Sequence, residues 1–157
     1  MMYEKFGQFI DGKWCQSSDK STYEVINPAN EETLGHASKA TPQDVDRALK
    51  SAEKGLQVWK KTPPWKRSYI IRRIADKIRE KQDVLAKWMT LEVGKPFVEA
   101  KGEVNGAADI FEWNAEETKR IYGQTVESRF EDTRVHVYYQ PVGVVAALSP
   151  WNFPAVL

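Results

Sequence analysis

The sequence has one cysteine and two histidines in 157 residues, and no apolar run near the roughly 20 residues of a membrane span. A single cysteine cannot form an internal disulfide and suits a reducing compartment, so we expect a cytoplasmic protein. Residues 1–6 lack the charged-then-apolar pattern of a signal peptide. The net charge is only +1, so nothing in the charge balance favours nucleic acid or a membrane surface as a partner.

The few residues able to act as nucleophiles or metal ligands are also isolated from one another. Cys15 has only Lys13 as a nearby cation, whereas a nucleophilic thiol needs neighbours that stabilise its thiolate. We therefore interpret Cys15 as a small strand residue. His36 and His136 lie in distant segments without a metal-spaced partner, so both are read as structural or surface residues and no metal site is expected.

The hydrophobic content of 41% is enough for a core, and four helices are predicted. Thr41, Pro42 and Asp44 form a capping-box-like start for the first helix, and Pro63 and Pro64 separate it from the second. The third is expected from about Asp83 to Gly94 and the fourth over 97–122. The side chains assigned to buried faces are Val45, Ala48, Leu49, Ala52 and Leu56 in the first helix, Ile70, Ile71, Ile74 and Ile78 in the second, Val84, Leu85, Trp88, Met89 and Leu91 in the third, and Phe111 and Trp113 in the fourth.

Strands are predicted on both sides of the helices. Asp11 and Gly12 favour a type I′ hairpin over 9–14, and short strands joined by a turn are expected over 23–38. Polar and apolar residues alternate over 124–141, a pattern typical of an exposed two-stranded ribbon. Residues 142–148 carry no polar side chain, which favours a parallel strand covered on both faces. Because the chain provides no sheet for this strand, we expect the isolated 157-residue chain to be marginally stable, to self-associate or to be partly disordered around 142–157.

The most informative segment is the proline-bracketed turn after residue 148. Pro150 and Pro154 fix their own φ angles and push Ser149 and Phe153 towards extended conformations. The Asn152 carboxamide is therefore presented from a stiff backbone at the carboxyl end of a strand, where α/β proteins bind ligands. Such an amide suits an oxyanion hole. A strand-to-helix connection in which Asn152 only caps the next helix would give the same pattern.

Five stretches of the sequence together carry a resemblance to a known family. They are Pro141-Val142-Gly143-Val144-Val145, Pro150-Trp151-Asn152-Phe153-Pro154, Val25-Ile26-Asn27-Pro28-Ala29-Asn30, Leu91-Glu92-Val93-Gly94-Lys95-Pro96 and the stretch 115–123. They resemble the amino-terminal region of the NAD(P)-dependent aldehyde dehydrogenases, and the overall similarity is greatest to succinate-semialdehyde dehydrogenases. The resemblance covers nearly the whole chain and implies an α/β fold that is incomplete: a helical segment, a protruding β-ribbon and the first strand of a Rossmann-like sheet.

The resemblance implies oxidation of an aldehyde to a carboxylic acid with NAD or NADP. In that scheme Asn152 donates to the oxyanion, Ser149, Pro150, Trp151 and Asn152 contact the cofactor, and Phe153 faces the substrate channel. Residues 1–157 are then part of a dinucleotide-binding domain, and 124–141 forms a homo-oligomer contact. The family's nucleophilic cysteine, glutamate base and glycine turn lie further along such a chain, so we expect these residues alone to be inactive.

Two other interpretations stay open. The chain could be a non-catalytic module that associates with intact subunits through 124–141. It could also belong to a related enzyme that reduces acyl phosphates or acyl thioesters, or that acts on a semialdehyde of the proline pathway, because the residues that distinguish these reactions lie downstream. Gly102 and Gly106 do not change this choice, because they lie within a predicted helix and indicate close packing rather than a dinucleotide turn.

Overall fold

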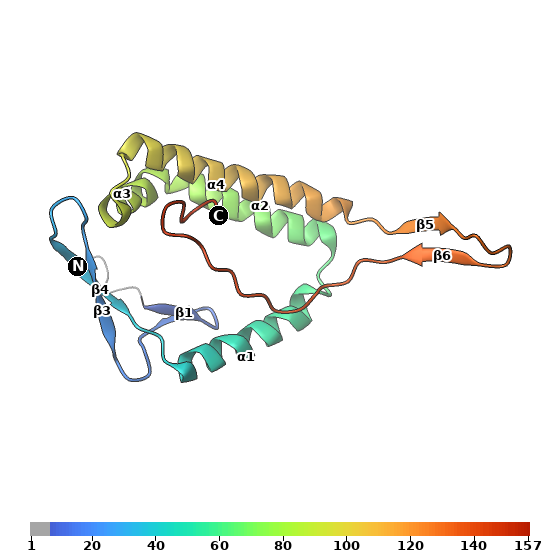
Figure 1. Cartoon of the computed structure of the whole chain (residues 1–157), viewed down its shortest axis with the longest axis horizontal. Helices are drawn as coiled ribbons and strands as arrows, with labels where there is room; N and C mark the ends of the chain where they lie inside the picture. Colours follow the sequence, from blue (N-terminus) through green and yellow to red (C-terminus); the bar gives the residue numbers. More distant parts are fainter. Residues whose placement is uncertain (1–6) are drawn as a thin grey trace.

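The computed structural model describes residues 7–157, and residues 1–6, where no signal pattern was found, lie outside the described part. Two hairpins come first, a helical segment follows, and a ribbon leads into the carboxyl-terminal stretch (Figure 1). No helix in the described part is both long enough and apolar enough to cross a bilayer. The elements are β1 (Gln8–Ile10), β2 (Lys13–Cys15), β3 (Thr22–Ile26), β4 (Thr33–Ser38), α1 (Pro42–Trp59), α2 (Pro64–Glu80), α3 (Gln82–Val93), α4 (Phe97–Glu117), the 3-10 turn η1 (Thr118–Arg120), β5 (Gln124–Glu127) and β6 (Arg134–Val137).

The amino-terminal strands form two separate antiparallel hairpins, β1–β2 and β3–β4. Asp11 and Gly12 connect the first hairpin with φ angles of 54° and 74°. Positive φ at both central positions is what a type I′ turn requires, so the predicted hairpin is confirmed. The predicted short strands over 23–38 are confirmed as β3 and β4, with an irregular register at Val25 and Ile26.

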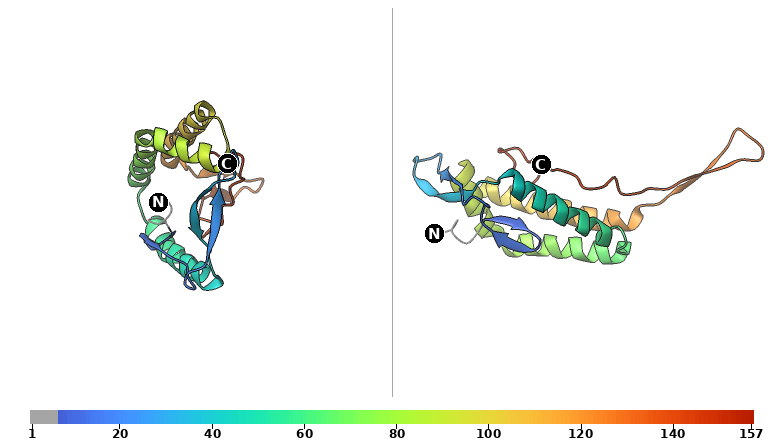
Figure 2. Two further views of the ribbon diagram at one scale, coloured as in Figure 1. Left: turned by 90° about the vertical axis from the view of Figure 1, so that its left-hand side faces the viewer. Right: turned by 90° about the horizontal axis from the view of Figure 1, so that it is seen from below.

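Helix α1 begins where the sequence predicts. The Thr41 hydroxyl accepts from the Asp44 backbone N–H, and the Asp44 carboxylate accepts from the Thr41 N–H, which completes a capping box. Its predicted apolar face is less buried than expected, because Val45 and Leu49 are each about half exposed. Figures 1 and 2 show the reason: α1 stands apart from α2 and α4, so no described helix covers this stripe.

Helices α2, α3 and α4 form the core. Ala86 and Met89 of α3 pack with Ala100 and Val104 of α4, and Ile78 and Val93 lie at the edge of this cluster. Fully buried alanines also occur at positions 75, 108 and 115. Side chains this small leave room for helix backbones to approach closely, and α2 and α4 lie side by side in Figure 1.

Ion pairs join α2 to α4 along their partly exposed faces. The Arg72 guanidinium donates to Glu112 and Glu116, each at 2.5 Å, and Arg79 donates to Asp109 at 2.7 Å and Glu112 at 2.6 Å. The hydrogen bonds that Arg72 donates to Glu116 and Glu112 raise its pKa. Arg72 and Arg79 of α2 therefore serve the contact between the two helices.

Several predicted core residues lie at the surface. Trp113 is 68% exposed, Phe111 is over a third exposed, and Val84 and Leu85 of α3 are also exposed. The buried face of α4 is instead made of alanine, valine and one glutamate, Glu103. The aromatic residues were assigned to the wrong face because only the neighbouring helices decide which stripe of α4 is covered.

Strands β5 and β6 form the predicted ribbon, which projects away from the helices, and the chain then returns towards α4 (Figures 1 and 2). The strand predicted over 142–148 is not formed: these residues have no ladder partner among the described residues, and Val142 and Leu148 are each 93% exposed. A strand is stabilised by pairing and by cover on its faces, and the described chain supplies neither here.

Candidate functional site

The proline-bracketed segment forms a compact turn, which we call the Asn152 turn (residues 149–157). The Leu157 backbone N–H donates to the Phe153 carbonyl at 3.2 Å, and the Ser149 hydroxyl donates to the Leu157 carbonyl at 2.8 Å. These bonds close the segment on itself. The structure thus brings all the predicted site residues, from Ser149 to Phe153, into one turn, although no strand precedes it.

Lys95 fastens this turn to the α3–α4 junction. Gly94 ends α3 in the left-handed conformation, with φ 78°, and Pro96 precedes α4, so the Lys95 side chain leaves from a sharp bend. The Lys95 ammonium donates to the Asn152 carbonyl at 2.8 Å and lies 3.9 Å from the centre of the Phe153 ring. Lys95 therefore holds the turn through a backbone oxygen and an aromatic face.

Glu103 of α4 completes the attachment. One of its carboxylate oxygens pairs with the Lys95 ammonium, and the other accepts the Ala155 backbone N–H at 2.9 Å. Only 3% of the Glu103 side chain and 12% of the Lys95 side chain are exposed. A charged pair this well covered needs each of its charges to be compensated, and here both partners also bond the turn.

Helix α4 contacts the Asn152 turn at Gly106. A Cβ added at Gly106 would lie 3.6 Å from a methyl group of Val156, which is ordinary van der Waals contact. The prediction that another element packs against the glycine is therefore confirmed at Gly106. It is wrong at Gly102, where an added Cβ would meet nothing within 4 Å. Both glycines lie inside α4, and neither belongs to a phosphate-binding turn.

The side chains at the tip of the turn are available to a ligand. Within residues 7–157, the Asn152 carboxamide makes no hydrogen bond, although its backbone oxygen is held by Lys95. Trp151 is 81% exposed. Phe153 is more constrained than expected, because one face of its ring lies against the Lys95 ammonium. The arrangement is a fixed backbone that carries a free amide donor.

Sequence reasoning missed Lys95 and Glu103. Glu103 could have been noticed, because it falls at helical spacing between Ala100 and Ala107, in a row of small residues that packs inside. An acidic residue in such a row needs a buried partner. Its partner could not be read from the sequence, because Lys95 precedes the helix and Ala155 lies far along the chain.

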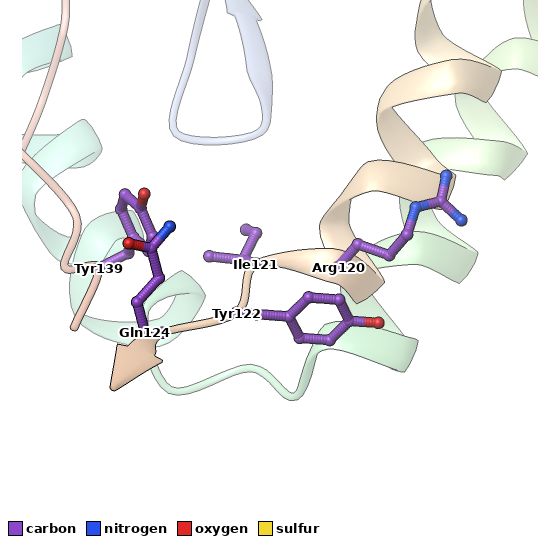
Figure 3. A pocket seen from close by; sticks show the side chains of 6 residues that line it. Arg120, Ile121, Tyr122, Gln124 and Tyr139 are labelled. Atoms are coloured by element: carbon purple, nitrogen blue, oxygen red, sulfur yellow. The ribbon is translucent and has the colours of Figure 1, made fainter. Parts of the chain in front are cut away.

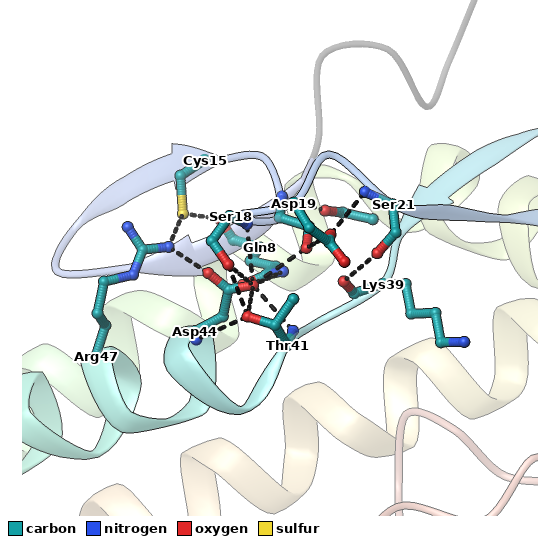
Figure 4. A network of polar contacts seen from close by, with 11 residues as sticks. Gln8, Cys15, Ser18, Asp19, Ser21, Lys39, Thr41, Asp44 and Arg47 are labelled. Carbon is teal, nitrogen blue, oxygen red and sulfur yellow. Dashed lines mark hydrogen bonds and ion pairs between the residues drawn. The ribbon is translucent and has the colours of Figure 1, made fainter.

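A second polar cluster surrounds Asp44 and has a structural role (Figure 4). The buried carboxylate accepts from the Thr41 N–H and from the Thr41 hydroxyl, both at 2.9 Å, from Arg47 at 2.7 Å and from the Ser17 hydroxyl at 3.2 Å. Hydrogen bonding, above all to the Thr41 backbone, holds the pKa of Asp44 far below its usual range. The Ser17 bond ties the segment after β2 to the start of α1, and the Thr41 and Arg47 bonds lie within that start, so the carboxylate serves the fold.

Cys15 belongs to the edge of this second cluster. Its Sγ lies 3.5 Å from the Gln8 carbonyl and 3.8 Å from an Arg47 nitrogen, and the residue sits at the end of β2 (Figure 4). Nothing connects it to the Asn152 turn, which agrees with its interpretation as a strand residue. Among the described residues, no three His, Cys, Asp or Glu side chains are grouped to hold a metal ion.

A pocket of about 610 Å³ lies at the base of the ribbon (Figure 3). Its lining contains none of the predicted site residues and no acid–base pair, so it offers no catalytic constellation. The lining residues are Arg120, Ile121, Tyr122, Gly123, Gln124 and Tyr139.

Comparison with known proteins gives consistent matches. Residues 14–157 match the model of the aldehyde dehydrogenase family. A glutarate-semialdehyde dehydrogenase of Pseudomonas putida is 44% identical over 95% of this chain, and the NADP(+) succinate-semialdehyde dehydrogenase of Escherichia coli is 43% identical over 94%. The crystal structure of an NADP-dependent enzyme of E. coli superposes with a TM-score of 0.91 at 42% identity, covering 97% of this chain and 32% of that one. The chain spans about a third of its curated relatives, 31% of each of these two.

Proposed function

The chain belongs to the aldehyde dehydrogenase family, and we propose that residues 1–157 form part of the dinucleotide-binding domain of an enzyme that oxidises an aldehyde to a carboxylic acid with NAD or NADP. The proposed substrate is a semialdehyde that carries a carboxylate, such as succinate or glutarate semialdehyde. The similarity to two enzymes named for these substrates supports that choice.

The observation that carries the proposal is the free amide of Asn152 on a turn held by its backbone. When a nucleophile adds to an aldehyde, negative charge develops on the carbonyl oxygen. An amide N–H that is already in place stabilises this charge in the transition state without reorganisation. Asn152 is proposed to make this contact. The nucleophile would come from outside these residues, because Cys15 belongs to the hairpin cluster.

The cofactor contact proposed for 149–152 agrees with the exposure of this side of the turn. Trp151 and Pro150 are exposed, while the Ser149 hydroxyl is already bonded to Leu157, which leaves the backbone at Ser149 to face a ribose or nicotinamide. The bound nicotinamide would accept the hydride from the substrate. The described residues contain no glycine turn for the pyrophosphate, so they would supply only one side of the cofactor site.

The proposal is tested by joining residues 1–157 to the remaining part of the E. coli succinate-semialdehyde dehydrogenase. We expect this fusion protein to oxidise succinate semialdehyde with reduction of NADP. Asn152→Ala should lower kcat by about 10²–10³-fold, roughly 3–4 kcal/mol of barrier, because one oxyanion donor is lost.

The matched control is Asn114→Ala, which removes an exposed carboxamide whose only hydrogen bond within residues 7–157 is to the Ile110 carbonyl of its own helix. Its kcat should stay within about twofold of the parent. Near-normal turnover in the Asn152 variant would remove Asn152 from the oxyanion role. An inactive, correctly folded parent fusion would count against the enzymatic assignment.

A non-catalytic role in association is the second candidate. The observation that favours it is the β5–β6 ribbon, which projects from the helices with every residue of β5 exposed and with unpaired outer edges (Figure 1). The same ribbon would join subunits in the enzyme. Mixing the chain with intact E. coli succinate-semialdehyde dehydrogenase and recording native mass spectra distinguishes the two candidates. If the chain forms mixed oligomers with the intact enzyme but its fusion protein is inactive, the non-catalytic role is favoured.

A further inference from the structure

We infer that Lys95 and Glu103 are positioning residues that set the direction of the Asn152 amide, an inference that rests on the oxyanion role proposed for Asn152. Neither side chain touches the amide itself. They bond the chain on both sides of it instead: Lys95 binds the Asn152 carbonyl and the Phe153 ring, and Glu103 binds the Ala155 N–H.

These contacts are arranged so that the turn cannot move away from α4 without breaking its bonds to both members of the ion pair. Each Glu103 oxygen has its own partner, one in Lys95 and one in the turn. Lys95 likewise divides its ammonium between Glu103 and the Asn152 carbonyl. Because both side chains are shielded from water, these charge-assisted bonds are strong and are weakly screened by salt.

The consequence for catalysis follows from preorganisation. An oxyanion donor is effective only if it already points at the position where charge develops, and a displacement of about 1 Å can cost roughly 10²-fold in rate. The Asn152 carboxamide has no partner in the described chain that could orient it. Its place therefore depends on the backbone that carries it, and Lys95 and Glu103 hold that backbone.

The first test uses the 157-residue chain. A single change would leave one buried charge alone and could disrupt folding, so the informative variant is Lys95→Met with Glu103→Gln. It removes both charges and the bond from Lys95 to the turn, and it leaves the Ala155 N–H with a neutral, weaker acceptor. We expect exchange of the Ala155 amide hydrogen to accelerate by at least about tenfold while the helical circular dichroism is retained. Unchanged exchange in this folded variant would overturn the inference.

The matched control is Lys101→Met. Lys101 also makes an ion pair, with Asp83 at 2.7 Å, and also lies over an aromatic ring, that of Phe97, but it has no contact with the turn. Its removal should leave Ala155 exchange unchanged. Lys95→Arg, which keeps a cation at the junction, should recover part of the protection. Equal acceleration by Lys101→Met would mean that the effect is general loosening of α4 and would also overturn the inference.

The second test measures turnover in the fusion protein. The Lys95→Met, Glu103→Gln variant should lower kcat by about 10–100-fold and change KM much less. In the Asn152→Ala background the same double change should have almost no further effect on kcat, because its action runs through the amide. Independent, multiplying losses would overturn the inference. A parent fusion without activity would refute the proposed function, and the exchange test would still decide whether the pair holds the turn.

Discussion

At the scale of single residues, the two aspartates near the hairpins show how hydrogen bonds make a carboxylate structural. Asp19 accepts from the Ser21 N–H at 2.8 Å and from the Ser17 hydroxyl at 2.7 Å. Hydrogen bonds from the hydroxyl and N–H of Ser21, followed by that of Ser17, lower the pKa of Asp19 from 3.8 to about 2. Asp44, buried beside it, has its pKa lowered further, first by the Thr41 backbone.

The sign of these shifts predicts acid sensitivity. A carboxylate with a folded-state pKa below its unfolded value stabilises the fold fully above the unfolded value, and this stabilisation is lost as the pH falls through the folded value. For Asp19 the loss should fall between about pH 4 and pH 2. Asp19→Asn should therefore lower stability to urea at pH 6 and should flatten its decline between pH 5 and pH 2.5.

Asp132→Asn is the control for this change, because Asp132 is exposed in the turn of the β5–β6 ribbon. It should leave the pH profile of urea unfolding as in the parent. A steep acid decline that persists in Asp19→Asn would show that other carboxylates carry it.

Contacts between single residues also show what could be predicted from the sequence. The Thr41–Asp44 capping box and the Asp11–Gly12 turn were predicted because their partners lie within a few positions of each other. The Lys95–Glu103 pair lies within eight positions but was missed, because its role depends on residues at the other end of the chain. Contacts between residues a few positions apart can be predicted from a sequence. A contact between distant segments can be predicted only when the course of the chain between them is known.

At the scale of elements, the helices meet through alanine. Ala75 of α2, Ala86 of α3 and Ala108 of α4 are fully buried, whereas the large aromatics of α4 face outwards. Helical spacing correctly predicted that the helices exist. Helical spacing could not predict which face of α4 would be covered. Phe111, Trp113 and Ala108 lie on the same helix, and whether each is buried depends on which side of α4 the neighbouring helices pack against.

This packing predicts that α4 tolerates no larger residue at Ala108. Ala108→Leu should destabilise the chain by about 1–3 kcal/mol, because the added carbons must push the helices apart or adopt strained rotamers. Thermal unfolding followed by circular dichroism measures the effect. Ala52→Leu in the exposed part of α1 adds the same atoms and should change the melting temperature little. Equal destabilisation by both would contradict the close approach of the helices.

At the scale of the whole molecule, two segments predicted to be covered carry apolar side chains that the described chain leaves exposed. One is the stripe of α1 that includes Val45 and Leu49, and the other is the stretch 142–148. The predicted strand at 142–148 is absent for the same reason that the α1 stripe is exposed. Each needs a partner element, and no propensity of its own residues can replace one.

The exposed stretch predicts self-association of the 157-residue chain. Val142 and Leu148 are almost fully exposed, and apolar patches of this kind associate in water. Sedimentation velocity should show an average mass that rises with protein concentration. Replacing both residues by serine should reduce this rise, whereas Val98→Ser, at an exposed position of α4, should reduce it less. A monodisperse monomer at every concentration would contradict the prediction.

The bend at Gly94 links three distant parts of the sequence. A Cβ at this residue would lie 3.1 Å from the Pro28 ring, and its φ of 78° disfavours any side chain. The ammonium of the next residue, Lys95, donates to the Asn152 carbonyl and so holds the Asn152 turn. A substitution at Pro28 or Gly94 should therefore displace Asn152, although neither residue is next to Asn152 in the sequence. In a library of random variants, both positions should behave like site residues, although neither can reach a substrate.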